Sequence, residues 1–261
     1  MRQAILVGDS LTQFGFDVAY HGWAAQLANL LQTRRDVVSR GCSGYTSLSL
    51  RALLPHLLRT SWPTAELQQL GDILVVWIGA NDAACPPSTQ HVPVAEYRTH
   101  LGAVLTSLDA HFPSARTRLV LTPPCVDERA WAVREGIDVT LKDVLYPRTN
   151  AAVAQYVGAA TEVGESKGWT VVDVYASFMA VTQVNDRAAL FCDGLHLSAA
   201  GNDRVFKLVR KAVLASQPAL ADQALEATSR AWPGWRLLPA VSAGPEPTRA
   251  VIDGFRAQGQ Q

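Results

Sequence analysis

The 261-residue chain has few cysteines, and no two of them are closely spaced. Cys42, Cys85, Cys125 and Cys192 form no C-x-x-C motif, so the sequence predicts neither a zinc site nor a disulfide framework. No stretch approaches the roughly 18 apolar residues that a membrane span needs. The first predicted strand begins almost at Met1, which leaves no room for a secretory leader. We therefore expect a cytoplasmic protein with reduced thiols.

The sequence also lacks an excess of charge of either sign. Lys and Arg together number 23 and Asp and Glu together number 23, so the formal net charge is +0. A basic excess is typical of proteins that bind phosphate backbones or anionic membranes. We therefore expect a small-molecule ligand as the partner, with no nucleic acid and no integral membrane contact, and we leave the oligomeric state open.

Motifs of several common enzyme classes are missing. No G-x-x-x-x-G-K-[ST] or G-x-G-x-x-G segment is present to hold phosphates, and the six histidines show no H-E-x-x-H spacing that would bind zinc. The G-x-S-x-G turn of α/β-hydrolases is also absent. The sequence therefore predicts no cofactor and no metal.

What the chain does contain is an alternation of short apolar runs and helical patterns. Such runs predict buried strands of a parallel sheet, and 48% hydrophobic residues suffice for a sizeable core. We predict an α/β fold, a three-layer α/β/α sandwich with a five-stranded parallel sheet, over residues 1–215. Residues 216–261 are predicted to be a C-terminal extension, partly packed and then loosely ordered. The predicted strands are 4–7, 36–39, 72–77, 118–122 and 169–174, the predicted helices are 20–32, 47–58, 94–111, 145–167 and 199–215, the last capped by Ser198, and residues 123–139 are expected to be irregular.

Four short motifs carry most of the polar side chains that suggest chemistry. GDSL at 8–11, GCSG at 41–44 and GAND at 79–82 each follow a predicted strand, and DGLH at 193–196 is the fourth. The carboxyl ends of parallel strands meet at one edge of a sheet, where α/β proteins bind their ligands. We therefore expect at least three of the motifs to converge on one site.

The residue types in these motifs suit nucleophilic catalysis. A serine hydroxyl needs a nearby base, usually a histidine oriented by a carboxylate, before it attacks a carbonyl group. Ser10 follows the first strand, while Asp193 and His196 are three residues apart, which places carboxylate and imidazole on the same side of one turn. Taken singly, each is more often a turn residue, a helix cap or a surface histidine. Taken together, they predict a catalytic triad of Ser10, Asp193 and His196.

Other residues of the motifs suit stabilisation of a negatively charged intermediate. The Asn81 side-chain amide and the backbone N–H groups of Gly44 and Ser10 predict a three-donor oxyanion hole. Singly, Asn81 fits an Asx turn and Gly44 a left-handed turn. Phe14, Tyr45 and Trp131 lie on or near the predicted motif loops and are candidates for the wall of a substrate pocket, with core packing an equal alternative.

In this order, the motifs resemble the SGNH (GDSL) hydrolase superfamily, whose four blocks supply Ser, Gly, Asn and His. Those letters fall on Ser10, Gly44, Asn81 and His196, and Asp193 matches the acid of the triad. Over about residues 4–215, the chain further resembles the isoamyl acetate-hydrolysing esterase group. The segments that carry this likeness are GDSLTQF at 8–14, RGCSGY at 40–45, QHVP at 90–93, TPP at 122–124 and DGLHLS at 193–198.

The resemblance implies a flavodoxin-like strand order and a serine esterase of the GDSL lipase type, acting on short-chain, acetyl-type esters. Several alternatives stay open at this point. Within the superfamily these are a lysophospholipase, a thioesterase or a carbohydrate acetylesterase, and an acyltransferase to alcohols. From another class, a catalytically silent binding protein could keep the same fold, although it would not need all four motif residues.

Overall fold

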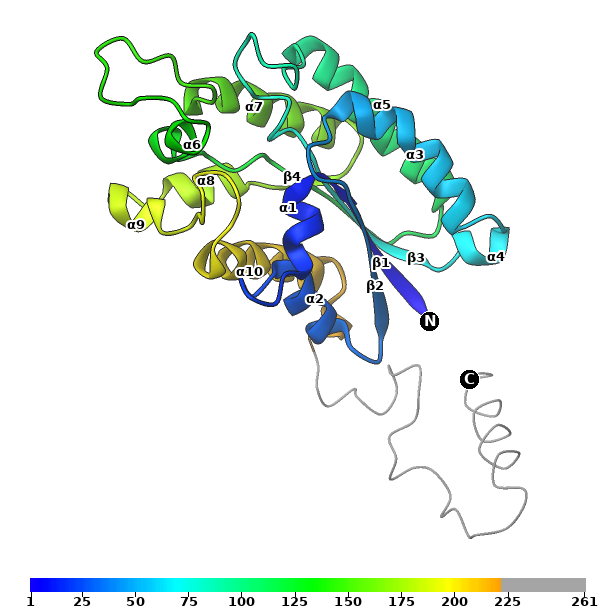
Figure 1. The fold of residues 1–261 in the computed structure, drawn as a ribbon. Helices are drawn as coiled ribbons and strands as arrows, with labels where there is room; N and C mark the ends of the chain where they lie inside the picture. Colours follow the sequence, from blue (N-terminus) through cyan, green and yellow to red (C-terminus); the bar gives the residue numbers. More distant parts are fainter. Residues whose placement is uncertain (222–261) are drawn as a thin grey trace, which may run out of the picture.

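The computed structural model describes residues 1–221, in which five parallel strands form a sheet (Figure 1). The strands are β1 (Arg2–Gly8), β2 (Arg35–Gly41), β3 (Gly71–Trp77), β4 (Thr117–Leu121) and β5 (Thr170–Val172). Their order, β2-β1-β3-β4-β5, is the flavodoxin-like order that the resemblance implied. The chain adds β2 on one side of β1 and then β3 on the other side, so the strand order reverses between β1 and β3. A crevice is expected beyond the carboxyl ends of these two strands.

Helices cover both faces of the sheet and complete the predicted α/β/α sandwich. One face carries α3 (Ser47–Ser61), α5 (Val94–His111) and α7 (Asn150–Ser166), which pack side by side (Figure 1). The other face carries α2 (Trp23–Leu31) and α10 (Ala199–Ser216), which contact each other. The shorter helices are α1 (Ser10–Gln13), α4 (Ala65–Gln68), α6 (Glu128–Arg134), α8 (Val174–Met179) and α9 (Val184–Ala188), with 3-10 turns η1 (Phe14–Phe16) and η2 (Pro218–Leu220).

The position of a strand in the sheet decides how deeply it is buried. All seven residues of β3 are buried, because β1 and β4 pair with its two edges and helices cover its faces. By contrast, β2 pairs only with β1, and none of its residues is fully buried. The prediction that residues 36–39 form a buried strand was therefore wrong about burial, although right about the strand.

Side-chain caps set where several helices begin. The Ser198 hydroxyl accepts a hydrogen bond from the Gly201 N–H, which confirms the predicted start of α10. Thr149 caps α7 in the same way, so this helix begins at Asn150 and not at residue 145 as predicted. Pro147 lies just before this cap, where it no longer interrupts the helix.

Two aspartates change the predicted boundaries in the second half of the chain. Asp127 caps α6, a helix within the segment predicted to be irregular. Asp173 accepts a hydrogen bond from the Ala176 N–H and begins α8, so β5 ends at Val172 and is shorter than predicted. The side chain of an Asp cap accepts a hydrogen bond from a backbone N–H group of the first helical turn, so this group is not available to pair with a neighbouring strand. Asp at such a position therefore favours the start of a helix over continuation of a strand.

One buried tryptophan connects three segments that are far apart in the sequence. The Trp23 indole N–H donates to the Leu11 carbonyl oxygen at 2.9 Å, which holds α1 against α2. The Trp23 backbone N–H donates to the Asn202 side chain at 3.1 Å, which holds α2 against α10. Its ring packs edge to face on Trp77 of β3, with centroids 5.8 Å apart. The first helix after β1 is thereby fixed relative to the last helix.

The predicted boundary between domain and extension lies close to the end of α10. Only the first residues of the extension belong to the described part of the chain, and residues 222–261 of the extension lie outside it. Within residues 1–221, no helix is both long and apolar enough to cross a membrane.

Candidate active site

The candidate nucleophile Ser10 is placed by the turn that follows β1. Asp9 accepts a hydrogen bond from the Leu11 N–H at 2.9 Å and caps α1, so Ser10 is the first residue of this helix. A side chain at Gly8 would collide with the Trp77 carbonyl and the Thr12 hydroxyl, so only glycine allows the strand to turn here. The Ser10 side chain therefore stands at the carboxyl edge of the sheet, at its switch point.

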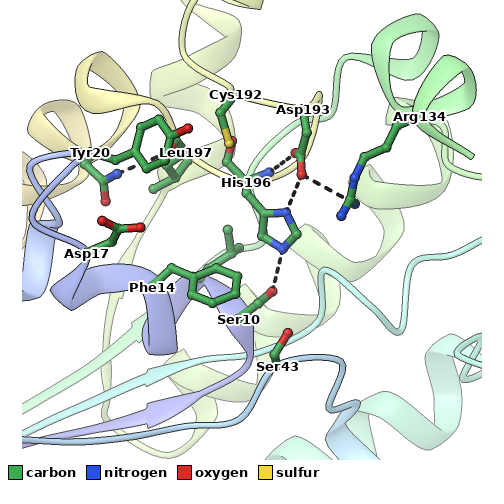
Figure 2. A pocket seen from close by; sticks show the side chains of 12 residues that line it. Ser10, Phe14, Asp17, Tyr20, Ser43, Arg134, Cys192, Asp193, His196 and Leu197 are labelled. Atoms are coloured by element: carbon green, nitrogen blue, oxygen red, sulfur yellow. Dashed lines mark hydrogen bonds and ion pairs between the residues drawn. The ribbon is translucent and has the colours of Figure 1, made fainter.

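Ser10, His196 and Asp193 form a chain of hydrogen bonds (Figure 2). His196 Nε2 lies 2.9 Å from Ser10 Oγ, and His196 Nδ1 lies 2.7 Å from Asp193 Oδ2. A carboxylate only accepts hydrogen bonds, so Nδ1 carries the ring proton and Nε2 is left free to accept the serine proton. The three residues predicted as a triad are thus brought together in the order that general-base catalysis requires.

The two oxygens of the Asp193 carboxylate accept hydrogen bonds from different groups. Oδ1 accepts the backbone N–H groups of Leu195 and His196 at 3.0 and 2.7 Å, while Oδ2 faces the imidazole. Burial by itself would raise the pKa of Asp193, but the hydrogen bonds from the His196 ring and these two N–H groups lower it to about 2. Asp193 is therefore ionised throughout the neutral pH range.

The three predicted oxyanion donors lie on the loops that follow β1, β2 and β3. Gly44 has φ of +78°, a left-handed conformation, and a Cβ there would meet only the Gln90 amide at 3.7 Å. Within residues 1–221, neither the Ser10 nor the Gly44 N–H makes a hydrogen bond. The Asn81 amide donates to the Tyr45 carbonyl at 2.9 Å, which joins the second and third loops and leaves one amide N–H of Asn81 without a partner in this part of the chain.

A cavity of about 290 Å³ opens beside Ser10 and His196 (Figure 2). Phe14, one of the candidate wall residues, lines it and packs edge to face on His196 with ring centroids 5.4 Å apart. Trp131 also packs edge to face on His196, with ring centroids 6.0 Å apart, but it does not line the cavity, and neither does Tyr45. The full lining is Ser10, Leu11, Phe14, Asp17, Tyr20, Ser43, Arg134, Cys192, Asp193, His196, Leu197 and Asn202.

Several of these lining residues were missed by sequence reasoning. Arg134 of α6 lies 3.4 Å from Asp193 Oδ2, and its guanidinium stands over the Trp131 ring at 4.4 Å. Asp17 and Tyr20 come from the segment between η1 and α2 and face the same cavity (Figure 2). None of the three belongs to a motif, so no spacing in the sequence points to them.

Two carboxylic acids are buried beneath these loops. Asp82 accepts the Ser47 N–H at 2.9 Å, which ties the β3 loop to the start of α3, and burial raises its pKa to about 6. Burial likewise raises the pKa of Asp9 to about 7. The Oδ2 atom of Asp9 has no hydrogen-bond partner within the described residues. Within residues 1–221, no cluster of three or more His, Cys, Asp or Glu side chains is arranged to hold a metal ion.

Comparison with known proteins places this geometry in a family. The model of the GDSL-like Lipase/Acylhydrolase family matches residues 6–204, which include all four motifs. The chain belongs to that family. The resemblance seen in the sequence is thereby confirmed, and the chain is an enzyme of the serine esterase class.

This GDSL-like hydrolase has relatives across animals and plants. It is 32% identical to the isoamyl acetate-hydrolyzing esterase 1 homolog of Mus musculus, with 78% of each chain covered. It is 35% identical to a GDSL esterase/lipase of Arabidopsis thaliana, over 80% of this chain and 85% of the relative. The crystal structure of Axe2, an acetylxylan esterase from Geobacillus stearothermophilus, shares 21% identity and a TM-score of 0.61 over 81% of this chain and 94% of that chain, a likeness of fold alone.

Proposed function

We propose that this enzyme hydrolyses short-chain, acetyl-type carboxylic esters through an acyl-enzyme formed on Ser10. His196 is the general base, and Asp193 orients its ring and stabilises its charged form. The observation that carries the proposal is the hydrogen-bonded chain from Asp193 Oδ2 through the His196 ring to Ser10 Oγ, with distances of 2.7 and 2.9 Å.

In the acylation step, Ser10 Oγ attacks the ester carbonyl carbon while its proton passes to His196 Nε2. The carbonyl electrons move onto oxygen, and when they return, the C–O bond to the alcohol breaks. The leaving alcohol takes the proton from His196. A water molecule then gives its proton to His196 and attacks the acyl group, and Ser10 leaves with that proton to release the acid.

The negative oxygen of the intermediate needs hydrogen-bond donors that are already in place. We assign this role to the Ser10 N–H, the Gly44 N–H and the remaining amide N–H of Asn81, which come from three adjacent loops. Loss of one such donor typically removes about 3 kcal/mol of transition-state stabilisation. Because the Ser10 and Gly44 N–H groups have no other partner in residues 1–221, they are free to serve the substrate.

The size and lining of the cavity favour a small substrate. A volume of about 290 Å³ is at the low end for ligand sites, which span roughly 300–1,000 Å³. Leu11, Phe14 and Leu197 supply apolar contacts, while Asp17 and Arg134 bring charges that a long acyl chain would not match. The homologous esterases whose name includes isoamyl acetate point in the same direction.

The test is hydrolysis of p-nitrophenyl esters of increasing acyl length by the wild type, Ser10→Ala and Ser43→Ala. Ser43 is the matched control, since it lines the same cavity but has no contact with His196. We expect the highest kcat/KM on acetate, no enzymatic rate in Ser10→Ala, and a near wild-type rate in Ser43→Ala. Equal rates at the level of uncatalysed background hydrolysis in folded wild type and Ser10→Ala would refute the mechanism and favour a binding protein.

The acyl-length profile also separates the alternative substrates. A kcat/KM that rises steadily with chain length would refute the short-chain assignment and favour a lysophospholipase or a thioesterase. Product analysis in the presence of a competing alcohol decides between hydrolase and acyltransferase, because only the transferase yields mostly the new ester.

A further inference from the structure

A buried arginine that the proposed mechanism does not use lies behind the oxyanion donors. Arg148 is 4% exposed and is located in the segment between α6 and α7. Its backbone forms an isolated antiparallel bridge with Ala84, and the neighbouring Pro147 carbonyl accepts the Cys85 N–H at 2.8 Å. This segment is thereby fixed against the loop that follows β3.

The Arg148 guanidinium contacts the segment between β3 and α5, which holds one of the donors. It donates to the Ala80 carbonyl, to Asn81 Oδ1 at 3.2 Å and to Gln90 Oε1 at 2.9 Å. Gln90 in turn donates from Nε2 to the Gly44 carbonyl at 3.1 Å. Arg148 therefore reaches Asn81 directly and Gly44 through one side chain.

The Arg148 guanidinium and the Tyr45 carbonyl together select the orientation of the Asn81 amide. An asparagine side chain has an accepting oxygen and a donating nitrogen that are nearly equal in shape, so packing does not distinguish its two orientations. A guanidinium has donors only. The Asn81 atom next to Arg148 must then be the oxygen, which directs the nitrogen toward the Tyr45 carbonyl and the oxyanion position.

The surroundings of Arg148 keep this contact in place. Its guanidinium lies over the Trp131 ring, 5.1 Å from the centroid. The acidic groups that interact with it are Asp9, Asp82 and Glu135. Burial lowers the pKa of Arg148 from its ordinary value, but a guanidinium begins so high that it stays protonated at neutral pH.

We propose that Arg148 is a positioning residue that fixes the orientation of the Asn81 amide so that its nitrogen faces the oxyanion. This proposal rests on the proposed function, which gives Asn81 its role. Without Arg148, only the Tyr45 carbonyl favours this orientation, so the amide turns its oxygen toward the developing negative charge more often. The effect is on the transition state and not on substrate binding.

The test is a double-mutant cycle of Arg148→Met and Asn81→Ala with p-nitrophenyl acetate. We expect Asn81→Ala to lower kcat by about 10²–10³-fold and Arg148→Met by at least about tenfold, with KM within about threefold of wild type. The double variant should be no more than about threefold slower than Asn81→Ala, because the arginine acts through the asparagine. Arg148→Lys keeps a donor-only cation and should recover part of the lost kcat.

Arg35→Met is the control for removal of a poorly exposed arginine. Arg35 is 13% exposed and binds Asp72 at the opposite end of the sheet, so its loss should affect stability and leave kcat unchanged. If the two kcat losses multiply in the double variant, or if Arg148→Met raises KM alone, the proposal is overturned.

A second readout keeps this test independent of the proposed function. The same four proteins are unfolded in urea, and the shifts of the midpoint are compared. Shifts that fall short of additive support the contact between Arg148 and Asn81 even in a protein without esterase activity, and additive shifts together with independent kcat losses refute it. A wild type without Ser10-dependent hydrolysis refutes the proposed function alone.

Discussion

Replacement of Asp193 by Asn tests the proposed mechanism most directly, because the two side chains differ by one group that faces His196. In Asp193→Asn, Oδ1 can still accept the Leu195 and His196 N–H groups, so the turn that carries the histidine is preserved. The new Nδ2 group then lies where Oδ2 accepted the His196 Nδ1–H. Since this nitrogen donates, Nδ1 has to become the acceptor and the ring proton moves to Nε2. The imidazole can no longer accept the proton of Ser10.

The loss of folding stability and the loss of kcat expected for Asp193→Asn differ in size. The pKa of Asp193, lowered from 3.8 to about 2, corresponds to about 2 kcal/mol of folding free energy at neutral pH. This contribution is present above pH 3.8 and is lost as the pH falls through 2. The wrong tautomer costs about 10⁴-fold in kcat, or about 5 kcal/mol of activation free energy. The loss of rate should therefore clearly exceed the loss of stability.

The assay is kcat and KM for p-nitrophenyl acetate together with urea unfolding. Asp203→Asn is the matched control, because Asp203 is an exposed carboxylate of α10 paired with Lys207 and lies outside the cavity. We expect kcat of Asp193→Asn to fall by about 10³–10⁴-fold with KM nearly unchanged. A kcat within about tenfold of wild type in the folded variant would refute the assignment of Asp193 to the triad.

Three further predictions concern the surroundings of the site and the remote end of the sheet. Gly44→Ala and Gly136→Ala replace glycines with φ of +78° and +79°, so both should lose about 1 kcal/mol of stability in urea unfolding. Only Gly44→Ala should lower kcat, by about tenfold, because relief of the backbone strain displaces the Gly44 N–H, which the variant keeps, from the oxyanion; equal kcat in both variants would contradict this displacement. Asp72→Asn removes a buried carboxylate shared by three arginines, which should cost on the order of 3 kcal/mol in stability and leave kcat of the remaining folded enzyme intact. Since burial raises the pKa of Asp9 to about 7, its contribution to the free energy of unfolding should fall by up to about 4 kcal/mol as the pH rises from 3.8 to 7, and Asp9→Asn should remove this part of the fall; an unchanged pH slope in the variant argues against a protonated Asp9.

The sequence is most informative where periodicity and burial agree. The helix predicted at residues 94–111 has those bounds in the structure, and the apolar run before Asn81 forms the fully buried β3. The helix keeps one buried face along its length and the strand is buried throughout, so the pattern of apolar side chains reveals each of them. Short elements such as α6 and α8 carry too few residues for a period, and their aspartate caps resemble ordinary turns.

The residues of the candidate site also differ in how far the sequence points to them. The sequence motifs name Ser10, Asp193 and His196, which the structure brings together: the end of β1 places Ser10 at the edge of the sheet, and the segment between α9 and α10 supplies the other two. Arg148 lies between Pro147 and Thr149 with no neighbouring motif, and its contact with Asn81 joins residues 67 positions apart. Such a contact arises from packing of two loops, which no local spacing encodes. Gln90 belonged to a recognised segment, but its link to Gly44 required the fold.

The distance along the chain between Ser10 and His196, 186 positions, has a consequence for how the protein is made. A growing polypeptide exposes its serine early, yet the hydroxyl has no base until the segment before α10 has left the ribosome and settled beside α2. If His196 is the base, as proposed, partly synthesised chains that lack it are expected to be inert toward esters. During refolding, the rate at which hydrolysis recovers then reports when α10 packs against α2. The rate at which circular dichroism recovers reports formation of the secondary structure as a whole.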